Sequence, residues 1–209
     1  MARFKIGNIK PVKGVDYFTP EEVAMFAPSG YGLGETSMPP VPDNPENIDR
    51  TGWYAFLGNL GHTGAPMQYG VIEAIYMNTQ AFLTAYPNGS DSIAVKRKHW
   101  DVWGEWEWVN PPMLPGEEYR TTEKYMGKPV YFKLVDCKGM PGTGSKTITH
   151  NAAGVVEWIV SVQGQVDTGR VFPCKGVEIE TSLTDIIIHA ENDSMKDAAC
   201  YVLLKYTKI

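Results

Sequence analysis

The stretch that decides the fold runs from His99 to Pro112 and reads HWDVWGEWEWVNPP. It holds four of the chain's six tryptophans within nine residues. Aromatic and β-branched residues favour a pleated, half-buried surface, and the side chains of a strand alternate between its two faces. The stretch therefore predicts a β-strand over residues 102–109, interrupted at Gly104 and ended by Pro111 and Pro112.

A period of two separates the side chains of this strand into two faces. One face holds Trp100, Val102, Trp106 and Trp108, and the other holds Trp103, Glu105 and Glu107. Two interpretations stay open. The tryptophans form an aromatic core stripe, because Trp buries a large apolar area. Alternatively, Trp103 with the two glutamates forms a platform on which a sugar ring stacks.

The composition limits what the chain can bind. It has 209 residues, 43% of them hydrophobic, which is enough for one large or two small domains. The formal charge of −5 argues against a nucleic-acid or anionic-membrane partner, because both require clustered Lys and Arg. There is neither a signal peptide nor an apolar run of about 18 residues, so we expect synthesis in the cytosol and no membrane insertion.

Three segments of the chain differ in amino-acid composition and pattern. Residues 1–50 are rich in Gly, Pro, Asn and Asp, with one short helix predicted over residues 20–26, and we expect an extended arm that attaches to another protein. Residues 51–115 are predicted to form a tryptophan-rich β module of short strands. In residues 116–209, strands in which apolar and polar side chains alternate recur about every ten residues, which favours a C-terminal β-sandwich.

The predicted fold class is therefore all-β. The last strand shows the pattern most clearly, because Cys200, Val202, Leu204 and Tyr206 share one face. We expect an antiparallel sandwich or jelly-roll-like C-terminal module, preceded by the small β module and the extended arm.

Few residues have a spacing typical of catalysis or of metal binding. The four histidines are widely separated, the three cysteines share no CxxC spacing, and residues 142–145 form a glycine-rich turn. Glu105 and Glu107 are the only candidates for a glycosidase pair, but neighbouring glutamates on a strand are usually a solvated face. We expect no metal, no cofactor and no catalytic residue.

Several segments resemble a known family. Residues 52–110 resemble the knob-type module of bacteriophage tail fibres and related pyocin-like tails, in which strands bearing Gln and Arg precede a closing W-G-x-W. Gln80, Arg97 and residues 103–106 match those positions. Residues 13–22, KGVDYFTPEE, resemble the stretch that follows a collagen-like tract in many phage fibres, and residues 201–208 resemble the β-sandwich heads that close such fibres.

The resemblance implies a non-enzymatic tail-fibre or receptor-binding component of a phage or prophage virion, made in the bacterial cytoplasm. It also implies a homotrimer that binds other virion proteins through residues 1–50 and a bacterial surface glycan. We expect Trp103 to stack on the sugar, with Glu105, Glu107 and Arg97 forming hydrogen bonds to it. Two alternatives stay open, a purely structural head or tail decorating protein and a surface-glycan depolymerase.

Overall fold

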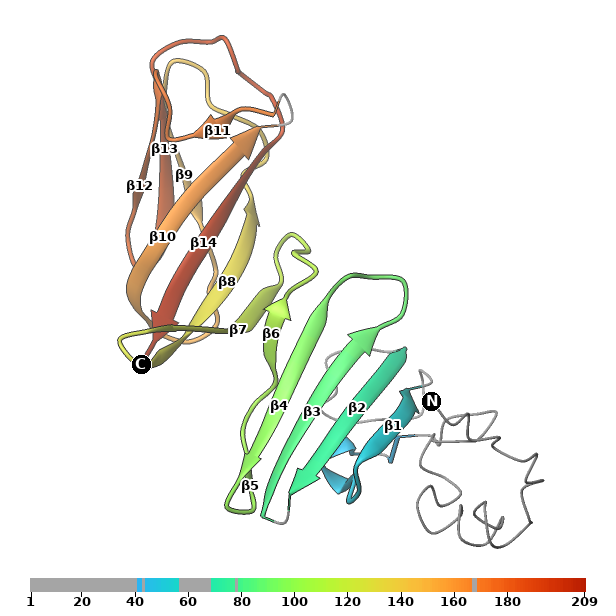
Figure 1. Ribbon diagram of the computed structural model, residues 1–209. Helices are drawn as coiled ribbons and strands as arrows, with labels where there is room; N and C mark the ends of the chain where they lie inside the picture. The colour runs from blue at the N-terminus through green and yellow to red at the C-terminus, as the bar shows by residue number, and fades with distance from the viewer. Residues whose placement is uncertain (1–40, 43, 57–68, 78, 167–168) are drawn as a thin grey trace, which may run out of the picture. The chain divides into compact units, whose positions relative to one another are not determined.

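Figure 1 shows the protein as a computed structural model, which describes residues 41–42, 44–56, 69–77, 79–166 and 169–209. These ranges form fourteen β-strands and one short 3-10 helix, which confirms the predicted all-β class. None of the helical structure in these ranges is long and apolar enough to cross a membrane. Residues 1–40 of the predicted arm, with the helix expected at 20–26, lie outside the described residues.

The chain divides into two compact units. The first comprises residues up to Asn88 together with Lys98–Val102, and the second comprises Gly89–Arg97 and Trp103–Ile209. The division falls within strand β4 (Ile93–His99), whereas the sequence predicted a boundary near residue 115.

The first unit contains an antiparallel meander of three strands. They are β1 (Gly52–Phe56), β2 (Gly70–Met77) and β3 (Gln80–Pro87). The register aligns Tyr54, Ile72 and Ala85 in one row, and all three are buried. These strands are formed because their apolar residues alternate along the chain and share one protected face.

The residues before β1 add to the buried part of this unit. Val41 donates its backbone N–H to Ala55, and Val41 and Ile48 are both buried. Between them lies the 3-10 helix η1 (Pro45–Asn47), which starts at Asn44 because that side chain accepts a hydrogen bond from the N–H of Glu46. This part of the predicted arm is therefore folded onto the first unit.

The second unit has a larger and a smaller sheet. The strand order of the larger sheet within this unit is β4-β6-β7-β8-β14-β10-β11, and the smaller sheet has the order β12-β13-β9. The strands not yet introduced are β5 (Val102–Trp103), β6 (Glu107–Asn110), β7 (Glu118–Tyr125), β8 (Lys128–Asp136), β9 (Gly144–Thr149), β10 (Val156–Val166), β11 (Val171–Phe172), β12 (Val177–Thr181), β13 (Asp185–Ala190) and β14 (Cys200–Lys208).

All but one of the strand pairings described in this unit are antiparallel. The exception is the pairing of β6 with β7, which run parallel at Trp108 and Thr121. Strand β14 is paired on both sides, with β8 along one edge and with β10 along the other (Figure 1).

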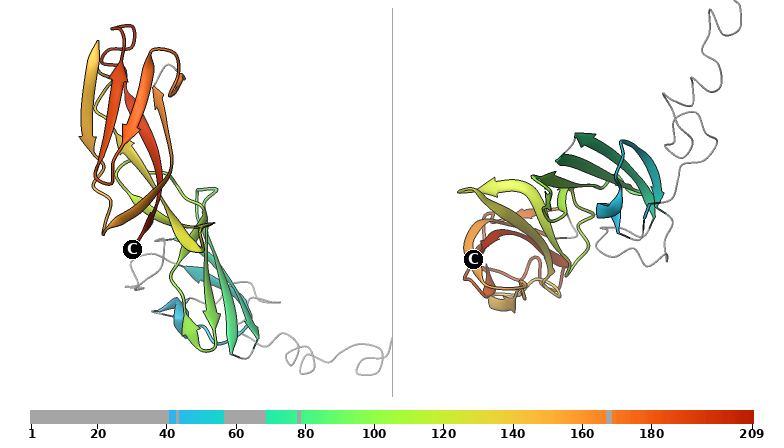
Figure 2. Two further views of the ribbon diagram at one scale, coloured as in Figure 1. Left: turned by 90° about the vertical axis from the view of Figure 1, so that its left-hand side faces the viewer. Right: turned by 90° about the horizontal axis from the view of Figure 1, so that it is seen from below.

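The two sheets pack face to face and form a β-sandwich (Figure 2). Val135, Val166 and Val202 of the larger sheet meet Val177 and Ile188 of the smaller sheet in one buried cluster. Burial of such side chains is the main force that holds the layers together. A sandwich of this kind is the architecture that the alternating pattern after residue 116 predicts.

One glycine is required by the packing of this sandwich. A Cβ atom added to Gly164 would lie 2.1 Å from the ring of Phe172, which is itself almost fully buried. The ring therefore occupies the space in which any other residue at 164 would place its side chain. This close approach fixes β11 against β10, the strand with which it pairs.

The three cysteines are free thiols. Cys137 and Cys200 are buried in the sandwich core, and Cys174 is exposed. The backbone N–H of Cys137 donates to the carbonyl of Cys200, so the two buried residues sit next to each other where β8 and β14 meet.

Candidate functional site

The tryptophan-rich stretch does not form one continuous strand. Strand β4 ends in a turn in which Trp100 and Asp101 have φ angles of 49° and 64°. After β5 the chain leaves the strand conformation over residues 104–106 and resumes it in β6. Strands β5 and β6 thus cover both ends of the predicted strand over residues 102–109, and the interruption predicted at Gly104 extends over residues 104–106. The left-handed turn at residues 100–101 was not predicted.

The turn also changes the predicted faces of the strand. Trp100 and Val102 were placed on the core face, but they are 69% and 70% exposed. Trp106 and Trp108 are half-buried, as expected of residues near a core. The Trp106 ring lies 5.9 Å from the Lys96 ammonium group, and the Trp108 ring packs edge-on against Tyr119 at 5.7 Å.

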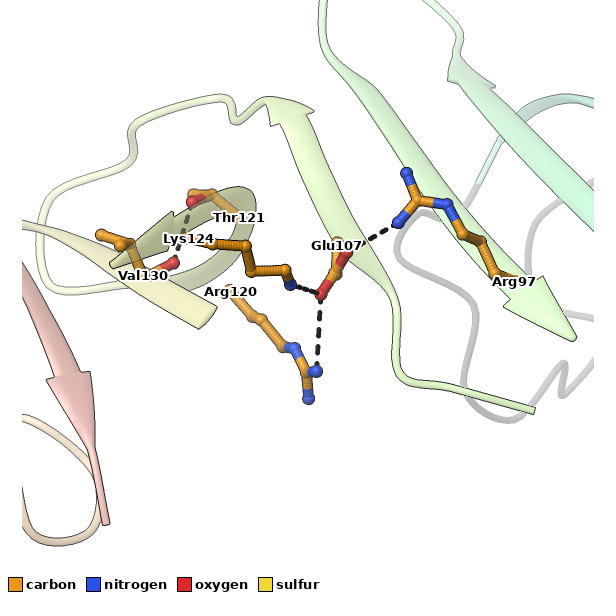
Figure 3. A network of polar contacts seen from close by, with 6 residues as sticks. All are labelled: Arg97, Glu107, Arg120, Thr121, Lys124 and Val130. Atoms are coloured by element: carbon orange, nitrogen blue, oxygen red, sulfur yellow. Dashed lines mark hydrogen bonds and ion pairs between the residues drawn. The ribbon is translucent and has the colours of Figure 1, made fainter. Parts of the chain in front are cut away.

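Glu107 is the centre of an ion-pair network in the second unit (Figure 3). Its side chain is only 9% exposed, yet its carboxylate contacts three cations. Arg97 Nη1 lies 3.2 Å from Oε2, Arg120 Nη2 lies 3.4 Å from Oε1, and Lys124 also donates to Oε1. A buried carboxylate is costly unless it is paired, and these contacts satisfy both of its oxygens.

The network explains why this stretch folds as it does. Arg97 comes from β4, Glu107 from β6, and Arg120 and Lys124 from β7, so one carboxylate joins three strands (Figure 3). Next to it, the Thr121 hydroxyl donates to the carbonyl of Val130 on β8. The parallel pairing of β6 and β7 is short, and these side chains reinforce it.

The four residues predicted to bind a sugar differ in their burial and in their contacts. Arg97 and Glu107 are in contact, Trp103 is half-buried at the end of β5, and Glu105 is exposed in the loop that follows. Glu105 and Glu107 do not share one solvated strand face, because the strand is interrupted between them. A sugar-binding role of the four residues stays a prediction.

The sequence reasoning missed a groove on the outer face of the larger sheet of the second unit. The groove has a volume of about 450 Å³ and is lined by residues of β8, β10, β11 and β14. The register brings Leu134, Leu203 and Gln163 into one row, with Gln165 and Tyr201 paired in the next. Their neighbours in sequence point into the core, so the alternation of β10 and β14 was the signal that could have located it.

A second cavity, of about 470 Å³, lies beside the edge of the sandwich. Lys133 and His150 line it, and both residues are buried. The Lys133 ammonium group donates to the carbonyl of Asn151 at 2.6 Å. His150 stacks on Tyr206, and burial lowers the pKa of its imidazole, with the positive charge of Lys133 acting in the same direction.

Tyr206 belongs to a polar cluster at the same end of the sandwich. Its hydroxyl and the Lys208 ammonium group both donate to the carboxylate of Glu118. Burial raises the pKa of Glu118, but these two hydrogen bonds and a third from the Ala153 N–H outweigh it, so the pKa lies below its usual value. Burial and the hydrogen bond to Glu118 raise the pKa of Tyr206.

One group of side chains has the residue types of a catalytic triad. Ser145 Oγ lies 2.6 Å from His189 Nδ1, and His189 Nε2 lies 3.5 Å from a carboxylate oxygen of Glu180. The histidine forms no hydrogen bond through Nε2 to any described residue, so Glu180 does not orient it. Neither of the two cavities described above is lined by Ser145.

Across the residues that the structure places, no three His, Cys, Asp or Glu side chains lie close enough together to hold a metal ion.

Comparison with known proteins gives resemblances at low similarity. No protein-family model and no curated protein matches the sequence. Among solved structures, an N-truncated R2-type pyocin tail fibre is similar at 10% identity and a TM-score of 0.28, over 81% of this chain and 96% of the fibre.

Two further fibre structures from P. aeruginosa are similar to the chain. The R2 pyocin fibre, residues 323–691, matches at 10% identity and a TM-score of 0.30, over 86% of this chain and 69% of that one. The R1 pyocin fibre, residues 323–701, matches at 11% identity and a TM-score of 0.30, over 78% and 65% of the two chains. At scores this low, the likeness is a resemblance only.

Proposed function

We propose that the protein is a tail-fibre or receptor-binding component of a phage or prophage virion, and that it attaches to saccharides of a bacterial surface. It acts as a homotrimer, is made in the bacterial cytoplasm, and is joined to other virion proteins through residues 1–50. It binds its receptor without catalysing a reaction.

The observation that carries this proposal is the exposure of large aromatic side chains on an all-β framework. Trp100 is 69% exposed and Trp158 is 54% exposed, and Trp53 is 36% exposed although its ring stacks on Tyr86. Trp is enriched at binding interfaces, because the indole ring offers a large apolar area together with an N–H donor. The apolar face of a sugar ring is a suitable partner, because it stacks on an aromatic ring while its hydroxyl groups remain hydrogen-bonded.

The environment of the acidic residues supports a binding role over a catalytic one. Both carboxylate oxygens of Glu107 are engaged by cations, so this group is poorly placed to transfer a proton to a glycosidic oxygen. Glu105 is exposed in the loop between β5 and β6, and the carboxylate that follows it in the sequence is Glu107 itself.

Adsorption to bacterial cells tests the proposal. The full chain, labelled with a fluorophore, is incubated with a panel of bacterial strains, and bound protein is measured after washing. We expect binding to a subset of strains, and competition by the polysaccharide extracted from a strain that binds. Trp100→Ala and Trp103→Ala are compared with Glu178→Gln, a change at an exposed residue of β12 that leaves the aromatic rings and the predicted sugar-binding residues in place.

The outcomes separate the alternatives. Adsorption that polysaccharide abolishes supports the proposal. Absence of adsorption to every strain, with the protein folded and incorporated in virions, favours a structural decorating protein. Release of reducing ends from the extracted polysaccharide would identify a depolymerase.

A further inference from the structure

The groove on the outer face of the second unit has the shape of a ligand site. Its volume of about 450 Å³ lies within the range of roughly 300–1,000 Å³ that is usual for small-molecule sites. Its walls belong to β-strands that are hydrogen-bonded to one another, so the groove is pre-formed and costs little ordering on binding.

The side chains that line the groove carry no charge. Leu134 and Leu203 are apolar, Gln163 and Gln165 end in amides, and Tyr201 presents a phenol ring. The neighbouring charges on the same face are neutralised within the protein. Asp136, paired with Tyr201 in the register, is 2.7 Å from the Lys138 ammonium group, and Lys205 is 3.0 Å from Glu123. An ionic ligand would lose water in the groove without gaining a counter-ion.

The two glutamines determine the polar part of the ligand. Both are exposed, and their side-chain amides form no hydrogen bond to any residue that the structure describes. Each amide offers two donors and an acceptor that a ligand can use. A purely apolar ligand would bury these groups without partners, which is unfavourable.

We propose that this groove binds an uncharged saccharide. The C–H face of a sugar ring fits against Leu134, Leu203 and the ring of Tyr201, and its hydroxyl groups bond to Gln163 and Gln165. The inference rests on the proposed function for the source of the sugar, a bacterial surface. The inference adds to the proposed function a binding location that does not include Trp103. It also adds the chemical class of the ligand, because the groove has no cationic side chain to pair with an acidic sugar.

Binding of defined oligosaccharides tests the proposal with the full chain. Neutral gluco-, galacto-, manno- and N-acetylhexosamine oligosaccharides are compared with oligogalacturonate by saturation-transfer NMR and calorimetry. We expect binding to at least one neutral probe, and affinity for oligogalacturonate that is lower by a factor of ten or more.

Substitutions locate the site. Gln163→Ala, Gln165→Ala and Tyr201→Ala should each weaken the neutral probe about tenfold, the loss of one or two hydrogen bonds or of one stacking ring. Gln163→Glu keeps the size of the side chain and should also weaken binding. Ser161→Ala is the matched control, because Ser161 is exposed on β10 and does not line the groove. Thermal melting of each variant separates loss of binding from loss of fold.

Each result has one meaning. If the protein adsorbs to cells but no neutral oligosaccharide binds, or the groove variants bind as well as the parent, the groove assignment is wrong and the proposed function stands. If a neutral probe binds through the groove but the protein adsorbs to no bacterium, the assignment stands and the proposed function fails. Equal binding of oligogalacturonate, or binding of a peptide in place of a sugar, overturns the inference.

Discussion

Glu107 shows how little of a side chain's environment can be predicted when only its sequence neighbours are known. Its position beside three tryptophans suggests a ligand contact, whereas its carboxylate is buried and engaged by Arg97, Arg120 and Lys124. Two of its partners follow it by thirteen and seventeen positions, and no spacing rule links residues so far apart. Its structural role could not be predicted from the stretch alone.

Neutralising Glu107 should destabilise the protein. In Glu107→Gln, the positive charges of Arg97, Arg120 and Lys124 remain close together around a neutral amide that no longer balances them. We expect a loss of about 2 kcal/mol in the free energy of unfolding, less than for a fully buried pair because Arg97 and Lys124 are partly exposed. Urea denaturation measures it. Glu105→Gln is the control and should change stability by less than about 0.5 kcal/mol; equal effects of the two changes would contradict the assignment.

Gly164 should tolerate no side chain. In Gly164→Ala the added methyl group overlaps the ring of Phe172, so β11 or the ring must move. We expect a loss of about 2–3 kcal/mol, measured by thermal or urea unfolding. Combining the change with Phe172→Leu should recover part of the loss, because the two residues compete for one space.

The control for this test is Gly104→Ala. A Cβ atom at Gly104 would meet the Arg97 carbonyl at 3.5 Å, an ordinary contact. A larger loss at 104 than at 164 would show that the packing of Phe172 does not govern the response.

At the scale of elements, alternation predicted some strands well and missed others. The short strands predicted within residues 51–115 include β1 and β2, and the alternating pattern predicted for residues 116–209 is present in β12, β13 and β14. Each has apolar residues at every second position facing one core, which is the signal that period-two reasoning detects.

The missed strands lack that signal. Strand β7 reads EYRTTEKY, and only Tyr119 and Thr121 of it are buried. Most of its remaining residues form ion pairs, which a hydrophobic pattern does not record. Strand β9 begins in the glycine-rich segment predicted as a turn, and lies at an edge of the small sheet with most of its side chains exposed. The groove was missed for a different reason. Strands β10 and β14 do show the alternation, but they and β8 are far apart in the sequence, and the pattern along the chain does not record which strands pair.

The end of the sandwich that carries His150 should respond to pH. The pKa of the His150 imidazole is lowered in the folded state. As the pH falls below about 6.5, the imidazole is therefore protonated in the unfolded chain before it is protonated in the folded protein. Stability should therefore decrease between pH 6.5 and the lower folded pKa, by at most about 1.4 kcal/mol per pH unit. Urea titrations at several pH values measure the slope.

His150→Gln should abolish the decrease in stability below pH 6.5. His99→Gln, a change at an exposed residue, should leave that decrease unchanged. Glu118 acts in a lower range. Its folded pKa lies below the usual value, so its stabilising effect is lost only as pH falls through that folded value. A slope between pH 6.5 and 5 that persists in His150→Gln would assign the pH response to another group.

At the scale of the whole molecule, the reactivity of the cysteines shows whether the two sheets of the sandwich stay packed against each other. One thiol, Cys174, should react with a thiol reagent such as DTNB in the native protein, and Cys137 and Cys200 only after denaturation. Counting reacted thiols with and without urea measures this. Cys174→Ser should abolish the native reaction, and rapid reaction of two or three thiols without denaturant would contradict the buried placement.

The homotrimer is the prediction that concerns assembly. Val102, Met126 and Ile209 are among the large apolar side chains that are exposed in the single chain, and contact between subunits would cover some of these. Light scattering of the full chain should give about three times the subunit mass of 23.2 kDa. A mass near that of one subunit at micromolar concentration would reject the trimer.

Strand β14 has a consequence for mechanical load. It is bonded along both edges, to β8 and to β10, and its hydrogen bonds lie across the direction in which the strand runs. Tension applied along β14 would have to shear both ladders together, rather than open them one bond at a time. Resistance to pulling depends on the rate at which the unit unfolds and not on its free energy of unfolding. The unit can therefore resist tension along β14 even if its free energy of unfolding is ordinary.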